Sequence, residues 1–263
     1  MRKKETITSL QAGKGNRKLV MITAYDALFA SLFHESVDMI LVGDSLNMSF
    51  LGEPDTLSAT LDQMIYHTKA VCNGAPKSFV ICDMPFGTVG TERDALANAV
   101  KVFRQTRADA IKVEGGKERA AIVKHLTQNA IAVMGHVGLM PQSVRSEGGY
   151  KIKGRDSKDF EAIMEDALSI EAAGAFAIVI EGVTPELAQA VTEALSIPVI
   201  GIGAGQETDG QVLVWSDMLG FFENFKPKFV KRYLQGATLV KEAVGEYAKE
   251  VRSGAFPTEE HTY

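Results

Sequence analysis

The chain has 263 residues, a formal net charge of −5 and 46% hydrophobic residues, so it can bury a large core but has no basic footprint for nucleic acid or an anionic membrane. Its two cysteines, Cys72 and Cys82, lie outside any CxxC or Cys/His cluster, which argues against a disulfide framework or zinc site and favours a cytoplasmic protein. Neither a secretory signal nor a stretch of membrane-span length is expected from the sequence.

Short apolar runs alternate with segments of helical periodicity along the chain. The runs predict strands that end near Thr23, Val42, Ile81, Val113, Met134, Ile180, Ile202 and Leu213. Apolar residues at three and four spacing predict helices over 26–35, 61–71, 94–105, 117–127, 159–172 and 185–195. This alternation predicts a (β/α)8 TIM barrel that forms a single domain over residues 1–263. An open doubly wound sheet is the alternative, and eight strand-like runs favour closure.

Several local signals refine this prediction. Thr184 followed by Pro185 predicts a helix start, and Gly174 predicts a helix stop. The last barrel unit is short, with about ten residues between Ile202 and Val212, so a turn is expected in place of its helix. Outside the minimum barrel, residues 7–11 predict a short helix that closes the barrel floor, and residues 228–251 predict a long amphipathic helix.

Three carboxylates, Asp44, Asp83 and Glu114, each follow the end of a predicted strand. Side chains alternate along a strand, so each acid is expected to share a face with the residue two positions earlier and to point inward. The pairs are Val42–Asp44, Ile81–Asp83 and Lys112–Glu114. A single acid of this kind often caps a helix or pairs with a surface base, but three together favour a site for a hard cation. Oxygen ligands favour Mg²⁺ over zinc without distinguishing it from Mn²⁺ or Co²⁺.

Lys112, His136 and Glu181 are the other candidate site residues. Lys112 is expected to balance the acids and to hold a substrate carboxylate or enolate; Schiff-base formation is the rival role, but clustered acids raise a lysine pKa and argue against it. His136 can donate a hydrogen bond to a developing oxyanion or serve a structural role. Glu181, with apolar neighbours, is the candidate base; its alternative is a carboxylate at the start of the next helix.

Two glycine-containing segments invite other interpretations. The GIGAG run at 201–205 suggests dinucleotide binding, but no helical pattern follows it at once, and a tight turn at the barrel mouth suffices. Residues 139–156 form a long segment that is either a lid or a solvated loop.

Several longer motifs occur together and in one order. They are GDS at 43–45, DMPFG at 83–87, KVEGG at 112–116, GHVGLMPQS at 135–143 and GIGAG at 201–205, with DGQVLV after it. On these motifs the chain resembles the ketopantoate hydroxymethyltransferase family from Leu19 to the loop after Phe229. The resemblance implies transfer of a hydroxymethyl group from 5,10-methylenetetrahydrofolate to 3-methyl-2-oxobutanoate, giving 2-dehydropantoate through a Mg²⁺-stabilised enolate. It also implies a homodecamer of two pentameric rings.

The resemblance also implies residue roles. Asp44, Asp83 and Glu114 would belong to the Mg²⁺ site, directly or through water, and Glu181 would accept the proton. The residues implied in substrate binding are Asp44, Ser45, Asp83 and Lys112, to which the strand-end position adds His136.

Two rival functions stay open at this point. One is an enolate enzyme like phosphoenolpyruvate mutase or isocitrate lyase, which shares the barrel but uses no folate; the KKCGH stretch typical of the lyases is absent from the sequence. The other is a non-catalytic barrel that binds an oxo acid, which would need the acids but no base. Glu181 and Lys112 argue against it.

Overall fold

The computed structural model describes residues 3–223 and 226–263. The chain divides into two compact units, with the boundary in the sequence between Val214 and Trp215, and each unit is described by itself. The single-domain expectation for residues 1–263 therefore stays a prediction.

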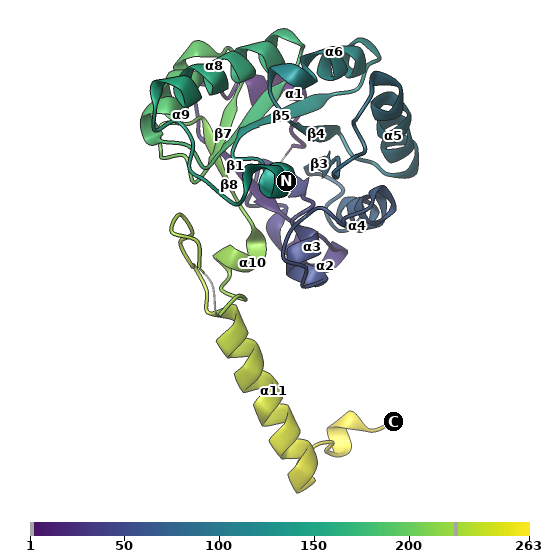
Figure 1. Cartoon of the computed structure of the whole chain (residues 1–263). Coiled ribbons are helices and arrows are strands. Elements are labelled where there is room, and N and C mark those ends of the chain that lie inside the picture. Colours follow the sequence, from purple (N-terminus) through teal and green to yellow (C-terminus); the bar gives the residue numbers. More distant parts are fainter. Residues whose placement is uncertain (1–2, 224–225) are drawn as a thin grey trace. The chain divides into compact units, whose positions relative to one another are not determined.

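The first unit is a closed barrel of eight parallel strands in chain order, surrounded by helices (Figure 1). The strands are β1 (Leu19–Thr23), β2 (Met39–Val42), β3 (Phe79–Asp83), β4 (Ala110–Glu114), β5 (Val133–Gly138), β6 (Ala177–Glu181), β7 (Val199–Ile202) and β8 (Gly210–Leu213). Pairing of β1 with β8 closes the sheet, which confirms the predicted (β/α)8 barrel over the open doubly wound sheet.

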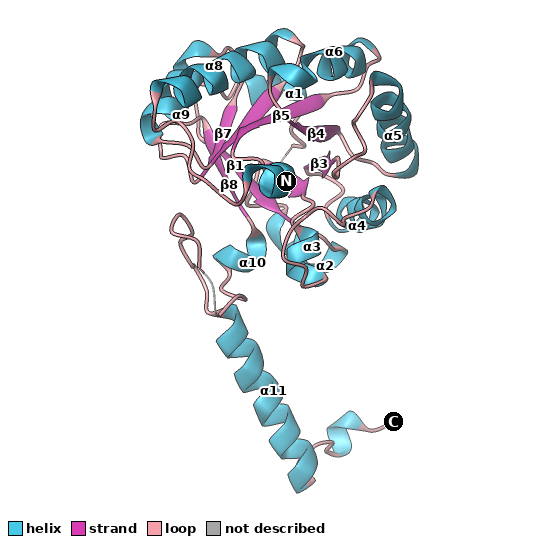
Figure 2. Ribbon diagram, viewed as in Figure 1, coloured by secondary structure: helices cyan, strands magenta, loops and turns pink. Residues whose placement is uncertain are grey.

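The helices of this unit lie around the strands (Figure 2). They are α1 (Ile7–Gln11), α2 (Ala27–Phe33), α3 (Leu46–Phe50), α4 (Leu61–Gly74), α5 (Glu92–Gln105), α6 (Ala120–Gln128), α7 (Val144–Glu147), α8 (Ser157–Ala172) and α9 (Pro185–Ala194), with short 3-10 turns η1 (Lys117–Arg119) and η2 (Pro141–Ser143). All six predicted helices are present with ends shifted by a few residues, and the helix predicted over 117–127 begins with the 3-10 turn η1. The elements α3, α7 and η2 were not predicted.

The local start and stop signals act as predicted. The Thr184 side chain accepts a hydrogen bond from the Leu187 N–H, and Pro185 takes the first position of α9, where its missing N–H costs no helical hydrogen bond. Gly174 follows α8 with a φ of 96°, a left-handed conformation that glycine adopts without a steric penalty. A turn rather than a helix joins β7 to β8.

The barrel interior is filled by side chains from alternate strand positions. The buried cluster comprises Leu10, Leu19, Met21, Met39, Leu41, Phe79, Ile81, Ala110, Met134, Phe176, Ala177, Val179, Ile200, Ile202 and Val212. Leu10 comes from α1 and is fully buried, so this short helix contributes to the barrel core. The prediction that residues 7–11 close the barrel floor is confirmed to that extent.

We expect Leu10→Ala to lower the free energy of unfolding by about 2–5 kcal/mol, because it removes a buried side chain and leaves a cavity in the interior cluster. Chemical denaturation of the purified variant measures this change. Leu28→Ala is the control, because Leu28 is exposed. If Leu10→Ala lowered the free energy of unfolding no more than Leu28→Ala does, α1 would not support the core.

The second unit contains α10 (Trp215–Met218), α11 (Gly236–Ser253) and the 3-10 turn η3 (Glu259–His261). The long helix begins at Gly236, so the prediction that it begins at residue 228 is wrong. Backbone N–H groups of Tyr233 and Gly236 donate to the Met218 and Leu219 carbonyls, and these contacts hold the preceding segment outside the helix. Within residues 3–223 and 226–263, no helix is both long and apolar enough to cross a membrane.

Candidate active site with a carboxylate cluster

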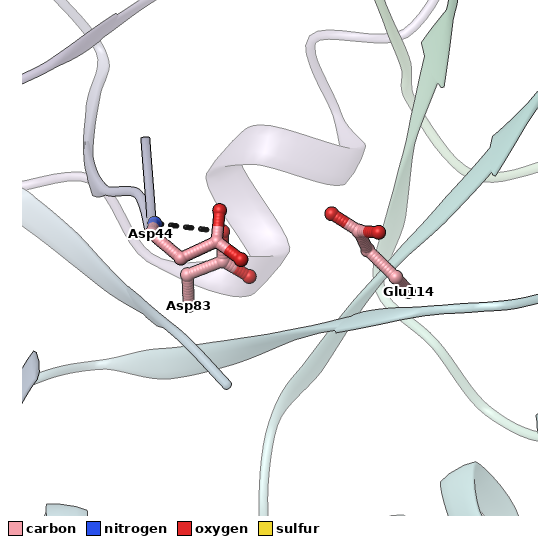
Figure 3. Close-up of side chains that lie close together, drawn as sticks. All are labelled: Asp44, Asp83 and Glu114. Atoms are coloured by element: carbon pink, nitrogen blue, oxygen red, sulfur yellow. Dashed lines mark hydrogen bonds between the residues drawn. The ribbon is translucent and has the colours of Figure 1, made fainter. Parts of the chain in front are cut away.

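Asp44, Asp83 and Glu114 lie together, as the sequence predicted (Figure 3). Each offers a carboxylate oxygen, and the three oxygens lie within 4.8 Å of one another. All three side chains are buried, and the Asp44 N–H donates to the Asp83 Oδ2 at 3.3 Å. The arrangement supplies a hard cation with the ligand type that Mg²⁺ prefers.

The route by which Asp44 reaches this cluster differs from the prediction. Met39 and Leu41 belong to the interior cluster, so Val42 lies on the other face of β2, and alternation along the strand does not place Asp44 inside. Strand β2 ends at Val42, and the turn that follows redirects the chain before α3. For Asp83 and Glu114 the predicted alternation is correct, because Ile81 and Ala110 both belong to the interior.

Lys112 is buried between the acids. Its Nζ lies 2.7 Å from Asp83 Oδ1 and 3.5 Å from Glu114 Oε1. Asp83 and Lys112 are register partners on β3 and β4, so the sheet itself fixes this pair. Burial alone would lower the pKa of Lys112, but attraction by Asp83 and Glu114 outweighs burial and raises the pKa. The lysine is therefore a permanent cation, which disfavours a nucleophilic role at neutral pH.

The acids carry more negative charge than Lys112 balances. Burial raises the pKa of Asp44 well above its usual range, and repulsion by Asp83 and Glu114 raises it further. Burial also raises the pKa of Glu114, with attraction by Lys112 opposing that shift. Without a bound cation, these shifts favour the neutral forms of Asp44 and Glu114. With all three carboxylates ionised, the cluster would exceed the charge of Lys112 by two units, which is the charge of a divalent cation.

The residues present therefore fit a divalent metal ion. The donors are all oxygens, and three carboxylates and one lysine lie together in a buried cluster.

His136 links this cluster to Glu181. Its Nδ1 lies 3.5 Å from Glu114 Oε1, and its Nε2 lies 3.4 Å from Glu181 Oε2 and 3.0 Å from the Leu139 carbonyl oxygen. Both ring nitrogens thus face acceptors of the protein. The predicted hydrogen bond from His136 to a substrate oxyanion stays a prediction. The hydrogen bond that the ring makes is the one between Nε2 and the Leu139 carbonyl oxygen.

Glu181 is more exposed than the cluster acids, at 19% of its side chain. The N-cap of helix α9 is Thr184, and the alternative role of Glu181 as a carboxylate at the start of this helix stays open. A carboxylate at the end of β6, held by a histidine and open to the barrel mouth, is suited to take a proton from a substrate.

Ser45 lies directly after Asp44 and is half-buried. Its Oγ lies 2.8 Å from the Tyr25 hydroxyl, a contact that the sequence did not indicate. The tyrosine therefore orients the serine that was predicted to bind substrate.

The predictions for the two glycine-containing segments have different outcomes. After β7 the GIGAG run enters a turn and then β8 rather than a helix, so the predicted turn in place of a phosphate-binding helix is confirmed. Residues 139–156 form η2 and α7, and Lys153 bridges to Val183, so the segment is partly ordered structure rather than a free loop. Its opening and closing as a lid stays a prediction.

Sequence comparison decides the family. The family model described as ketopantoate hydroxymethyltransferase matches residues 4–259. The chain belongs to this family. It is 64% identical over 260 residues to the 3-methyl-2-oxobutanoate hydroxymethyltransferase of Aliarcobacter butzleri, covering 99% of this chain and 97% of that protein. The Nitratiruptor protein of the same name is 63% identical over the full length of both chains. The chain is thus a hydroxymethyltransferase of pantothenate biosynthesis.

Solved structures with the same fold are more distant in sequence. Phosphonopyruvate hydrolase matches with a TM-score of 0.63 at 15% identity, covering 97% of this chain and 92% of that chain. A 2,3-dimethylmalate lyase of the PEP mutase/isocitrate lyase superfamily matches with a TM-score of 0.59 at 16% identity, covering 98% and 91%. These likenesses show the shared barrel alone. The rival enzyme class therefore has the same fold, and only the sequence relatives separate the two.

Proposed function

We propose that this enzyme moves a hydroxymethyl group from 5,10-methylenetetrahydrofolate to 3-methyl-2-oxobutanoate, giving 2-dehydropantoate, with a Mg²⁺ ion held at Asp44, Asp83 and Glu114 directly or through water. The observation that carries the proposal is the buried carboxylate trio with Lys112 inside it. A 2-oxo acid offers a carboxylate and a ketone oxygen, which suit binding to a metal ion and to the neighbouring ammonium group of Lys112.

A divalent cation held at this site would supply charge stabilisation at the ketone oxygen, which would make the C3 proton more acidic. Glu181 then takes the C3 proton as a general base. Lys112 offsets the negative charge that develops on the enolate, and Ser45 binds the oxo acid. Carbon C3 forms a bond to the folate-borne methylene carbon, both bonds from that carbon to the folate nitrogens N5 and N10 break, and water supplies the hydroxyl group. The proton removed from C3 and the remaining proton of the water end on the two nitrogens, which gives tetrahydrofolate.

An assay of the purified protein tests this function. Incubation with 3-methyl-2-oxobutanoate, 5,10-methylenetetrahydrofolate and Mg²⁺ is expected to yield 2-dehydropantoate, detected by mass spectrometry, with none formed after chelation of the metal. Product formation at an equal rate with excess chelator would contradict the metal dependence. Proton exchange at C3 without product on adding the folate would favour the rival enolate chemistry, and oxo-acid binding without exchange would favour the non-catalytic barrel.

The role of Lys112 has a separate test. We expect treatment with borohydride in the presence of 3-methyl-2-oxobutanoate to leave Lys112 unmodified, because its raised pKa keeps the amine protonated and unable to attack the ketone. Peptide mass mapping measures this, with a Schiff-base aldolase as the positive control. An adduct on Lys112 would contradict a purely electrostatic role and would indicate that the lysine forms a Schiff base with the substrate.

We propose a cytoplasmic homodecamer of two pentameric rings, as the family resemblance implies. Two observations support these proposals. Both cysteines are buried and free, which suits a reducing compartment. Helix α11 exposes apolar residues at four- and three-residue spacing, a pattern suited to packing against another copy. They are Val240, Val244, Tyr247 and Val251. We expect sedimentation to give ten times the monomer mass, and a monomer would contradict the assembly.

A further inference from the structure

Gln142 contacts two carboxylates of the cluster from the segment that follows β5. Its Nε2 donates to Asp44 Oδ2 at 2.9 Å, and its backbone N–H donates to Glu114 Oε2 at 3.1 Å. The same Nε2 donates to the Met84 carbonyl oxygen at 3.0 Å. Gln142 thus contacts two of the three acids. It also contacts the backbone of Met84, which directly follows the third acid, Asp83.

These contacts also fix how the Gln142 amide is turned. Both partners of Nε2 are acceptors, so the opposite orientation of the amide would set oxygen against oxygen. The two N–H groups of the amide are therefore both used. Because the amide is neutral, it holds Asp44 without reducing the negative charge that a cation requires.

Gln142 forms a hydrogen bond to one oxygen of each of two carboxylates. Its hydrogen bonds occupy Asp44 Oδ2 and Glu114 Oε2. The other Glu114 oxygen, Oε1, is the one that faces Lys112 and His136, each at 3.5 Å. Each of these two carboxylates thus has one oxygen that accepts a hydrogen bond from Gln142 and one that does not.

The segment that carries Gln142 is also held by contacts further along the chain. Arg145 pairs with Asp55 at 3.0 Å. Further along, the Lys153 N–H donates to the Gly182 carbonyl at 2.9 Å, beside the end of β6. Gln142 is thus held in place by contacts that do not involve the carboxylates.

We propose that Gln142 is a positioning residue that makes Asp44 and Glu114 present one oxygen each to a divalent cation, and so sets the coordination and affinity of the ion. The proposal rests on the metal site proposed above. Its physical basis is that hydrogen bonds to ligand carboxylates orient them and tune the metal they hold.

Titration of the metal-free protein with Mn²⁺ alone, followed by electron paramagnetic resonance, tests this proposal. Gln142→Met keeps the length of the side chain and removes both N–H donors. We expect about 10-fold weaker Mn²⁺ binding, the lower end of what loss of such a partner costs, together with an altered spectrum of the bound ion because Asp44 is free to rotate. Gln189→Met is the matched control, since Gln189 also donates to a carboxylate, that of Glu193, but on the surface of α9.

The spectrum separates positioning from a structural role. A variant that melts at a lower temperature but binds Mn²⁺ with unchanged affinity and spectrum would overturn the proposal, because Gln142 would then only hold the segment. If Gln142→Met does not fold, Gln142→Ala is measured in the same way, with the same expected and contrary results. Failure of the wild-type protein to bind Mn²⁺ would overturn the metal site and this proposal with it.

Discussion

Glu181→Gln is expected to retain 3-methyl-2-oxobutanoate binding and to slow exchange of the C3 proton by about 10²- to 10⁴-fold, the usual contribution of a general base. The amide has nearly the shape of the carboxylate and can still contact His136, but it cannot accept a proton at neutral pH. Proton NMR in D₂O measures the exchange, and calorimetry measures binding of the oxo acid.

Glu186→Gln is the control for this change, because Glu186 is an exposed acid in the first turn of α9, a few residues along the chain. It should exchange the C3 proton at the wild-type rate. Wild-type exchange in Glu181→Gln would remove Glu181 from the mechanism, and loss of both exchange and oxo-acid binding would make it a binding residue.

Asp83→Asn is expected to abolish stabilisation of the protein by Mg²⁺. A ligand at 100 times its dissociation constant stabilises a protein by about 2.7 kcal/mol, so the wild-type protein should gain this amount and the variant almost none at the same concentration. The asparagine keeps the shape of the side chain but loses its charge, and it leaves Lys112 with a weaker partner. Thermal unfolding with and without Mg²⁺ measures the difference.

Asp62→Asn provides the matched control. Asp62 forms an ion pair with Lys101 at 2.6 Å, nearly the distance of the Asp83–Lys112 pair, but on the surface. Exposed ion pairs contribute little to the free energy of unfolding, and Asp62 lies outside the carboxylate cluster. Mg²⁺ should therefore stabilise this variant as much as it stabilises the wild type. Equal stabilisation of Asp83→Asn would show that Asp83 is not a metal ligand.

Much of the barrel could be predicted because its strands and helices follow local rules. Apolar runs gave the strands, helical spacing gave the outer helices, and Thr184 with Pro185 marked a helix start that the structure confirms. The start of α11 could not be predicted in this way. Its apolar spacing continues back to residue 228, but hydrogen bonds to the 218–219 carbonyls compete with the helix there.

The site was predictable to the extent that strand ends meet at one mouth of a parallel barrel. That rule placed Asp83, Glu114 and Asp44 together. Alternation was wrong for Asp44, because Met39 and Leu41 are the interior residues of β2 and Asp44 reaches the cluster through the turn after Val42. Gln142 was missed, since no periodicity shows how the 139–156 segment turns back over the carboxylates. The only signal was its place in the motif GHVGLMPQS.

The most direct test of the account follows the C3 proton of 3-methyl-2-oxobutanoate by NMR in D₂O with the purified enzyme, before and after Mg²⁺ and then 5,10-methylenetetrahydrofolate are added. We expect loss of the C3 signal only when the metal is present, followed by hydroxymethyl resonances once the folate derivative is added. Two results would contradict a metal-assisted proton transfer to Glu181. One is exchange of the C3 proton at the same rate in the presence of a chelator, and the other is product formation by a protein that does not exchange the C3 proton.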